Sequence, residues 1–401
     1  MSKADTSQPE RQLVLVGGGH THALAVRRLG RRPLAGMRIT LISESEYAPY
    51  SGMLPGHIAG FYRWEDMHID LRALCESAGV NFVSARVSAV DLKRREVHCE
   101  GCEPILADVL SLNVGATPRL SDCPGAEQWA IPSKPVARLL AGWKQVLAWS
   151  GQAGQALRIV IVGGGAGGVE LALAMQRQLP KGTSLTLIHH GRELLPGHNS
   201  RVRATLTKLL HERGISVRLA TRVIAVTEHA VCCDSGAAFE SDFVFWVTQA
   251  MPPSWLRASG LAVTTEGFVR VAPTLQSLSH SWVFAAGDVA ALENAPLPKT
   301  GVFAVRMAKP LVVNLRAFCA GTPMHPYQAQ RHFLSLIGTA DGKAVASRRW
   351  LAGHSALFWR WKDWIDRRFM RQFPRLPDRP RSSPFEPLTN PATLGAPEIP
   401  P

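Results

Sequence analysis

Short apolar runs recur along this chain, and a glycine turn and a helical pattern follow the first of them. Residues 13–16 (LVLV) are all apolar, and three glycines follow at 17–19. Apolar residues then recur at 23, 24, 26 and 29, which is the spacing of one helix face. A continuous apolar run of this length is typical of a strand buried on both faces of a parallel sheet. The pattern therefore predicts a strand, a tight turn and a helix.

A second copy of the pattern lies in residues 158–174 (RIVIVGGGAGGVELALA). Gly163, Gly165 and Gly168 have the full G-x-G-x-x-G spacing. In the first copy, His22 takes the place of the third glycine. In such units the glycines let the backbone turn and approach a pyrophosphate, and the helix N-terminus offers N–H groups to its negative charge. Two copies predict two dinucleotide sites.

Further apolar segments predict elements between and after the two copies. The expected strands are 38–43, 80–98 with a turn at Lys93–Arg94, 109–117, 184–188, 243–248, which closes the second domain, and 282–289. The expected helices are 67–79, 130–149 and one that starts within 298–308. Strands that alternate with helices indicate βαβ units. We predict an α/β fold with two Rossmann-like dinucleotide-binding domains, the second inserted in the first, and a C-terminal amphipathic helical segment.

The domain limits follow from these segments. We expect the first domain at 1–125 and 261–335, the second at 126–260, a strand and amphipathic helix segment at 336–380, and a tail at 381–401. The tail is rich in proline and poor in apolar residues, so we expect it to be disordered.

Composition narrows the class of protein. Of 401 residues, 46% are apolar and 19% charged, as in ordinary globular proteins. No run approaches the ~20 apolar residues of a spanning helix, and the polar N-terminus lacks the apolar core of a signal peptide. A cytoplasmic location is therefore expected. The seven cysteines, Cys99 and Cys102 included, lack the spacing of a disulfide framework or a zinc site, so no metal is expected.

The positive charge is concentrated near the C-terminus. The net charge is +14, and residues 347–381 hold ten Lys or Arg against three Asp, which gives a surplus of seven. Half of the excess therefore lies in this short region. A basic groove over the whole protein is not indicated, and we expect no nucleic-acid partner.

An amphipathic helix is predicted in this basic region, over residues 358–373. Apolar residues recur at three- and four-residue spacing, namely Phe358, Trp361, Ile365, Phe369 and Phe373. The opposite face carries Arg360, Asp363, Arg367 and Arg371, with a Lys362–Asp366 pair at i,i+4 spacing. Trp, Phe and basic residues together favour a helix that lies in a membrane interface, here the inner face of the cell membrane. The alternative is a helix docked on its own domain with a solvated basic face.

Polar residues at the strand ends are candidates for ribose contacts. The strand at 38–43 ends in Ser43, and Glu44 follows. An acid at this place binds a ribose 2′-hydroxyl. The strand of the second copy ends in His189, His190 and Arg192 instead. Basic residues there would suit a 2′-phosphate, or would simply be solvated.

Three motifs, in order, give the chain a family resemblance: GGGHTH at 17–22, GGGAGGVE at 163–170 and VFAAGD at 283–288. With them the chain resembles the two-dinucleotide flavoprotein reductases, also called the pyridine nucleotide-disulfide oxidoreductase superfamily, from residue 13 to about 319. It is most similar there to the type II NADH dehydrogenase-like branch. Residues 48–60 (APYSGMLPGHIAG) and 359–370 (WRWKDWIDRRFM) resemble the flavoprotein domain found fused ahead of selenide, water dikinase.

The resemblance implies FAD in the first unit and NADH or NADPH in the second. The implied FAD-binding residues are Gly17, Gly18, Gly19, His20, Ser43, Glu44, Gly115, Asp288, Thr300, Gly301 and Val302. Those implied for the nicotinamide nucleotide are Gly163, Gly165, Gly168, His189 and Thr248. Catalytic roles are implied for Glu170, near the nicotinamide, and for Lys299, before a helix start whose amides face the flavin. Such a helix start stabilises negative charge on the reduced ring.

Two departures from the family pattern concern the electron acceptor. Disulfide reductases carry a cysteine pair soon after the first unit, where this chain has only Cys75, well downstream. We therefore expect direct transfer from the flavin. Quinone-reducing relatives carry two glutamines after the flavin-facing turn, where this chain has Val302 and Arg306.

Three functional hypotheses follow. The first is an enzyme that oxidises NAD(P)H and reduces a quinone or similar small acceptor. The second is a sulfide- or selenium-linked oxidoreductase that uses Cys123 or Cys319. The third, prompted by Val302 and Arg306, is a flavin-binding sensor or assembly partner that does not turn over.

Overall fold

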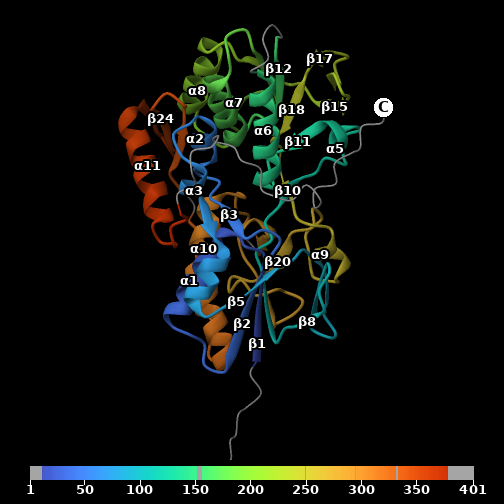
Figure 1. Cartoon of the computed structure of the whole chain (residues 1–401), viewed down its shortest axis with the longest axis vertical. Helices are drawn as coiled ribbons and strands as arrows, with labels where there is room; N and C mark the ends of the chain where they lie inside the picture. The colour runs from blue at the N-terminus through green and yellow to red at the C-terminus, as the bar shows by residue number, and fades with distance from the viewer. Residues whose placement is uncertain (1–10, 151–155, 249, 294, 331–332, 378–401) are drawn as a thin grey trace, which may run out of the picture.

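The structure, a computed structural model, describes residues 11–150, 156–248, 250–293, 295–330 and 333–377. Figure 1 shows two α/β lobes, with a small antiparallel sheet and helix α11 (Ala356–Met370) along one side. Buried apolar residues form one large cluster in the first lobe and two in the second. The predicted fold class is confirmed.

The first lobe is built on a parallel sheet of five strands in the order β21-β9-β1-β2-β5. These strands are β1 (Arg11–Val16), β2 (Met37–Ser43), β5 (Asn81–Ser84), β9 (Val109–Leu112) and β21 (Val283–Ala285). Its main helices are α1 (His20–Arg31), α4 (Leu71–Ala78) and α10 (Gly301–Ala320), and α1 packs against the other two. Strand β21 joins this sheet only after the whole second lobe, so the second domain is inserted in the first.

The second lobe repeats this plan with the strand order β11-β18-β12-β13-β14. Its strands are β11 (Ala130–Pro132), β12 (Arg158–Val162), β13 (Ser184–Ile188), β14 (Ser216–Arg218) and β18 (Phe243–Trp246), and its helices are α6 (Val136–Ser150), α7 (Ala166–Gln178) and α8 (Ser200–Glu212). Ile159 and Ile161 pack in one cluster, whereas Val160 and Val162 pack in the other. This alternation is the period of two of a strand with both faces covered.

One sequence prediction for this lobe is wrong in part. The segment 130–149 begins as strand β11 and becomes helical only at Val136, because proline at 132 and 135 removes the N–H groups that a helix interior needs. The strand expected at 243–248 is β18, which is the last strand of this sheet in chain order and lies between β11 and β12.

Shorter elements complete the structure, and most of their strands form small separate sheets. The remaining strands are β3 (Tyr47–Pro49), β4 (His68–Asp70), β6 (Val87–Asp91), β7 (Glu96–Cys99), β8 (Ile105–Leu106), β10 (Thr117–Pro118), β15 (Val223–Val226), β16 (Ala230–Cys233), β17 (Ala238–Glu240), β19 (Ala250–Met251), β20 (Val269–Val271) and β22 (Ala290–Leu292). The short helices are α2 (Leu54–Ile58), α3 (Trp64–Met67), α5 (Ala126–Trp129), α9 (Trp255–Ala258) and the 3₁₀ turn η1 (Gly287–Val289). The helix predicted at 67–79 begins as β4 and is helical only in α4. The predicted turn at Lys93–Arg94 is confirmed, since both N–H groups bond the Asp91 carboxylate.

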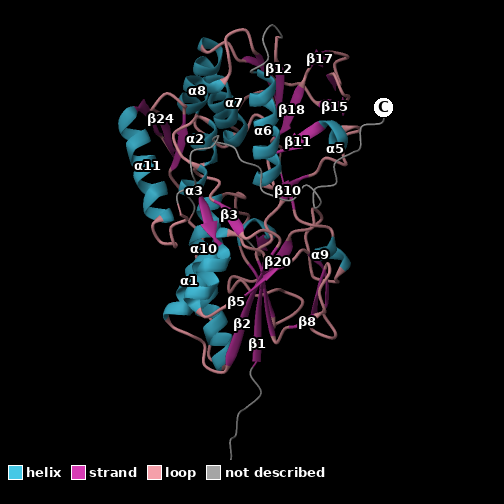
Figure 2. Ribbon diagram, viewed as in Figure 1, coloured by secondary structure: helices cyan, strands magenta, loops and turns pink. Residues whose placement is uncertain are grey.

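The C-terminal segment forms β23 (Ser335–Gly338), β24 (Ala344–Arg348), β25 (Leu351–Ser355) and α11, in which Ser355 caps the helix start. Figure 2 shows α11 beside both lobes. Its orientation differs from the prediction, because Lys362 and Asp366 face the protein, whereas Trp361 and Ile365 face outward and are 44% and 36% exposed. The predicted disordered tail, 381–401, lies outside the described residues. Within the described ranges, no helix is long and apolar enough to cross a membrane.

Candidate active site

The first glycine turn lies at the carboxyl end of β1. Gly17 has a φ of +96°, and a Cβ atom on it would lie 2.5 Å from the Asn113 carbonyl oxygen. A Cβ on Gly19 would lie 2.3 Å from the side-chain oxygen of Asn113, and one on Gly18 would meet Ser43. Side chains are thus excluded from the turn. The N–H groups at the start of α1 face the sheet edge where parallel folds bind ligands.

His22, in the place of the third glycine, is fully buried in α1. Its Nδ1 lies 2.8 Å from the Gly17 carbonyl oxygen, and its Nε2 lies 2.8 Å from the Ser111 hydroxyl oxygen. Burial lowers its pKa to about 4, so the ring is neutral at pH 7. Since a carbonyl only accepts, Nδ1 donates to Gly17 and Nε2 accepts from Ser111. Asn113 completes the network: its side chain accepts from the His22 N–H and donates to Ala286.

An ion pair joins the carboxyl edges of the two sheets. Asp288 lies in η1, three residues after the last residue of β21. Lys134 lies two residues after the last residue of β11 in the second lobe. The Lys134 ammonium lies 2.8 Å from an Asp288 carboxylate oxygen. Sites at the ends of the two sets of strands therefore face one another. Gly115 has a φ of +71°, and no atom lies within 4 Å of a Cβ built on it.

The start of α10 is a second polar feature of the first lobe. The Thr300 hydroxyl is buried and has no hydrogen-bond partner among the described residues. The amides of Gly301 and Val302 lie in the first helical turn, where no carbonyl within the helix can accept from them. Lys299 donates to the Ala290 carbonyl oxygen at 2.5 Å and lies over the Phe268 ring.

These residues fit the predicted FAD. A pyrophosphate matches the glycine turn, a ribityl chain offers hydroxyls to Asp288, and the pyrimidine edge of a flavin matches the start of α10. His20, which the resemblance implies as an FAD-binding residue, begins α1, and its Nε2 lies 3.2 Å from the Pro49 carbonyl oxygen. Burial lowers the pKa of Lys299 to about 8, and Asp288 opposes the shift.

The second glycine turn, at the end of β12, has the same backbone plan. A Cβ on Gly163 would lie 2.3 Å from the Val247 carbonyl oxygen and 3.2 Å from the Thr248 nitrogen. One on Gly168 would lie only 1.8 Å from the Gly163 carbonyl oxygen. One on Gly165 would meet no atom within 4 Å. The space in front of Gly165 is therefore open to a ligand.

The residues at the two candidate ribose positions, Ser43 with Glu44 in the first lobe and His189 in the second, differ in chemical type and in their contacts. Ser43 is buried and bonds the Ser45 carbonyl, and the exposed Glu44 pairs with Arg86 at 2.5 Å. His189, predicted as a nucleotide ligand, is buried, and its Nδ1 accepts from the Gly164 N–H at 3.3 Å. Its ring supports the glycine turn from within.

Glu170, on α7, borders a small cavity between α2, β23 and α11. The cavity is lined by Pro55, Gly56, Ala59, Phe61, Glu170, Ala174, Gly338, Ala340, Trp359 and Lys362. One Glu170 carboxylate oxygen accepts from the Gly338 N–H at 2.7 Å. Burial raises the pKa of Glu170 to about 7, although Lys362 opposes the shift. Glu170 can therefore take up or release a proton near neutral pH.

A buried ion pair of α11 lies beside this cavity. The Lys362 ammonium lies 2.6 Å from Asp366 and 2.6 Å from the Gly52 carbonyl oxygen, and the Tyr50 hydroxyl donates to Asp366 at 3.1 Å. Since a buried charge needs partners, the loop around Tyr50 determines how α11 docks. The sequence prediction of a solvated polar face is wrong for this pair.

The cysteines of the sulfur or selenium hypothesis do not meet. Cys123 is buried in the outer cluster of the second lobe, whereas Cys319 lies near the C-terminal end of α10 and packs against the cluster of the first lobe. No group of three or more His, Cys, Asp or Glu residues that could hold a metal occurs in the described ranges.

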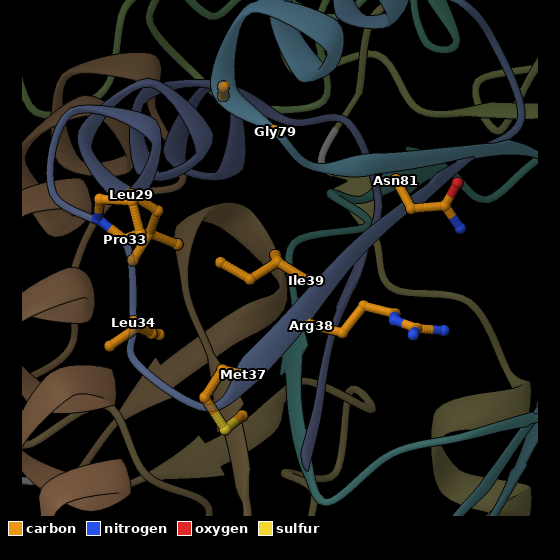
Figure 3. A pocket seen from close by; sticks show the side chains of 9 residues that line it. Leu29, Pro33, Leu34, Met37, Arg38, Ile39, Gly79 and Asn81 are labelled. Carbon is orange, nitrogen blue, oxygen red and sulfur yellow. The ribbon is translucent and has the colours of Figure 1, made fainter. Parts of the chain in front are cut away.

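Figure 3 shows a hollow at the other end of the first sheet. It is lined by Leu29, Pro33, Leu34, Met37, Arg38, Ile39, Ala78, Gly79 and Asn81. Met37 and Asn81 begin β2 and β5, so the hollow lies at the amino ends of the strands and is separate from the glycine turns.

Comparison with known proteins establishes the family. A model of the pyridine nucleotide-disulphide oxidoreductase family matches residues 11–310. The chain belongs to this family of oxidoreductases, whose fold implies FAD and NAD(P)H binding.

Relatives within the family are distant. The chain is 23% identical over 379 residues to the type II NADH:quinone oxidoreductase of Staphylococcus epidermidis, covering 88% of this chain and 94% of that protein. It is 26% identical over 353 residues to the demethylphylloquinone reductase NdbB of Synechocystis sp., covering 84% and 86%. The solved structure of the Aquifex aeolicus sulfide:quinone oxidoreductase matches with a TM-score of 0.76 at 18% identity, over 90% of this chain and 92% of that one, which shows a shared fold.

Three residues of the site were not found from the sequence. Asn113 and Lys134 act through contacts with segments far along the chain. Tyr50 lies in the 48–60 segment, which the sequence singled out only for its resemblance to a flavoprotein domain. An asparagine just before Gly115, at the end of an apolar strand, was the one available signal.

Proposed function

We propose that the protein oxidises NAD(P)H through bound FAD and passes the electrons to a quinone or similar small acceptor, without a redox-active disulfide. The observation that carries this proposal is the Lys134–Asp288 ion pair. It brings the carboxyl ends of the strands of the two parallel sheets opposite one another. A nucleotide at each glycine turn would then reach toward the other across the junction. The distant likeness to a type II NADH:quinone oxidoreductase and a demethylphylloquinone reductase supports a quinone acceptor.

Bound FAD supplies the hydride acceptor and the electron carrier. The glycine turns would hold the two pyrophosphates, and the amides of Gly301 and Val302 would donate to the pyrimidine edge of the flavin. Positioning of this kind accounts for much of the catalysis of a hydride transfer. Glu170 holds a proton at its carboxylate near neutral pH and gives it to the reduced acceptor. That Glu170 and Lys299 belong to the catalytic site stays a prediction from the family resemblance, whereas the proton transfer from Glu170 is part of our proposal and rests on its burial and pKa.

The test is anaerobic mixing of the purified, FAD-loaded protein with NADH and NADPH, followed by a soluble quinone. We expect the flavin absorbance to bleach and then to return when the quinone is added. Gly165→Val is the matched variant, because a Cβ atom at this position meets no protein atom within 4 Å and the added side chain would occupy the open space at the second turn. It should keep FAD and lose bleaching. Wild-type flavin that neither nucleotide reduces would contradict the proposal and favour the sensor hypothesis.

The alternative function, a sulfide- or selenium-linked oxidoreductase that uses Cys123 or Cys319, can be tested by chemical modification. Alkylation should leave quinone reduction intact, because Cys123 and Cys319 lie in separate clusters away from the first glycine turn. Loss of activity in a variant that lacks both cysteines would favour that alternative. The resemblance to the domain fused to selenide, water dikinase stays a prediction.

We also propose peripheral attachment to the inner face of the cell membrane through α11. The outward stripe of this helix consists of Leu357, Trp361, Trp364 and Ile365. Arg360, Arg368 and Arg371 are exposed beside it. Exposed Trp and aliphatic residues with basic neighbours suit the interface of an anionic bilayer.

Flotation with vesicles of phosphatidylcholine and phosphatidylglycerol tests the attachment. The wild type should float, and the Trp361→Ser/Trp364→Ser variant should not. Ile224→Ser removes a single exposed apolar residue on β15 and serves as the control. Equal flotation of all three proteins would contradict a role for α11.

A further inference from the structure

The two glycine units can be matched residue by residue at the ends of their second strands. In the first lobe Val16 pairs with Ile42, and in the second lobe Val162 pairs with Ile188. Counting onward by one and two residues, Ser43 and Glu44 of the first unit correspond to the next two residues of the second unit, His189 and His190. The carboxylate of the first unit is therefore replaced by an imidazole.

This position decides how the adenine ribose of a dinucleotide is recognised. A carboxylate there accepts a hydrogen bond from the 2′-hydroxyl and repels a 2′-phosphate, whereas a basic residue accommodates the phosphate. A phosphate monoester carries a charge of about −1.5 to −2 at pH 7, so the sign of the neighbouring side chains has a large effect.

The side chains around this position in the second lobe are basic and have no acidic partner. His190 and Arg192 make no ion pair with any residue that the structure describes, and Arg192 is exposed. The neighbouring acid, Glu193, is paired with Arg203 at 2.5 Å. A free guanidinium thus stands two residues after the position of His190.

The loop that carries these residues is fixed to the end of β14. The His189 N–H donates to the Arg218 carbonyl at 2.8 Å, and the Ala220 N–H donates to the Gly191 carbonyl at 2.8 Å. The Thr221 N–H closes the contact by donating to the His189 carbonyl at 3.1 Å. The hydrogen bonds hold the backbone between Ile188 and Arg192 in one conformation. They also bring the exposed Arg218 beside it.

We propose that the end of β13 is a binding site for a phosphate monoester, the 2′-phosphate of NADPH, held by His190 and Arg192. The protein then uses NADPH in preference to NADH. This inference rests on the proposed function only in that the second glycine turn binds a nicotinamide nucleotide. His189 is not part of the site, because its ring is enclosed behind the glycine turn.

The test compares 2′,5′-ADP with 5′-AMP, which differ only by the 2′-phosphate, in calorimetric titrations of the FAD-loaded protein. We expect 2′,5′-ADP to bind about 10- to 100-fold more tightly, as one or two charge-assisted hydrogen bonds would give. Arg192→Glu should abolish this preference and leave the affinity for 5′-AMP unchanged. Lys181→Glu makes the same charge reversal in the loop before β13, at the opposite end of the strand, and should keep the preference.

Equal affinities in the wild type, or an unchanged preference in Arg192→Glu, would overturn the inference. Failure of the wild type to bind either nucleotide would overturn the proposed function as well, so the two failures can be told apart. A matching shift in the NADPH-to-NADH ratio of kcat/KM for Arg192→Glu would support the assignment during turnover.

Discussion

The two glycine turns share a backbone and differ in almost every side chain that supports it. The Asn113 and Val247 N–H groups donate to Val16 and Val162, each at 2.8 Å, so these positions correspond. Registers pair Ser111 with Leu15 and Phe245 with Ile161, and His22 corresponds to Gly168. The first turn is thus supported by a buried network of His22, Ser111 and Asn113. The second is supported by close backbone packing at Gly168 and by a single side-chain contact, from the Gly164 N–H to His189.

This difference shows that the G-x-G-x-x-G spacing is one of several ways in which a sequence can support the same tight turn between strand and helix. In the second lobe the backbone of α7 approaches Gly163 closely. In the first lobe, the His22 ring fills the corresponding space and supplies the hydrogen bond that the Gly17 carbonyl needs. A sequence that departs from the G-x-G-x-x-G pattern can therefore keep the turn.

The largest effect is expected for Gly168→Ala. Its methyl group would lie 1.8 Å from the Gly163 carbonyl oxygen, so α7 must move away from β12. We expect the second lobe to lose its native packing and nucleotide binding, as for severe overpacking of about 3 kcal/mol or more. Gly165→Ala is the control, because nothing lies within 4 Å of its Cβ. Urea unfolding followed by circular dichroism checks this, and equal midpoints would contradict it.

The next effect is the pH dependence that the buried His22 ring gives to the stability of the first turn. The pKa of His22 is about 4 in the fold and near 6.5 when unfolded. Unfolding therefore takes up a proton between these values, and stability falls as pH decreases from about 6.5 to 4, by about 3 kcal/mol in total. Urea midpoints at pH 7, 6, 5 and 4 should show this slope, and His22→Asn should reduce it. An unchanged slope in the variant would contradict the assignment.

A smaller effect is expected from a difference between α1 and α7, the helices that follow the two turns. Glu170 occupies the place on α7 that Leu24 occupies on α1, and its pKa is about 7. If it protonates the acceptor, acceptor reduction should slow as pH rises through about 7. Glu170→Gln can keep a hydrogen bond to Gly338 and should abolish that pH break, with a rate loss of about 10- to 100-fold. Hydride transfer from NADPH to the flavin, measured by stopped flow, is the internal control. A break that persists in the variant would assign it to another group.

The smallest effect concerns the ribose position of the first unit. Glu44→Gln weakens a charge-assisted hydrogen bond to a 2′-hydroxyl, so FAD affinity should fall about five- to tenfold. Glu46→Gln, which also removes the acid of a surface ion pair, should leave it unchanged. Fluorescence titration of the apoprotein with FAD measures both. Equal affinities in the two variants would place the ribose elsewhere.

Local patterns predicted the parts of the fold that depend on neighbouring residues. The apolar runs beside the glycines were sufficient for β1, α1, β12 and α7, because strand, turn and helix follow within a few residues. Strand β11 was missed because three residues carry no periodicity. Its place in the sheet depends on pairing with β18, more than a hundred residues away.

The site was less predictable where it depends on distant partners. The Lys362–Asp366 spacing read as a surface pair, since nothing on α11 itself reveals the Gly52 carbonyl and Tyr50 hydroxyl that surround it. Lys134 likewise could not be identified as a site residue from its own neighbours, because its partner, Asp288, lies in the other lobe. Residues whose partners come from another lobe leave no local signal.

The wall of the Glu170 cavity that β23 and α11 supply has a consequence for biosynthesis. These elements leave the ribosome after both nucleotide lobes have been made, so until then the carboxylate of Glu170 stays open to water on this side. Nucleotides can enter the nascent protein before α11 arrives to close that side. A nonsense mutation a few codons before codon 335 would yield a product with both nucleotide turns and a Glu170 carboxylate exposed to solvent.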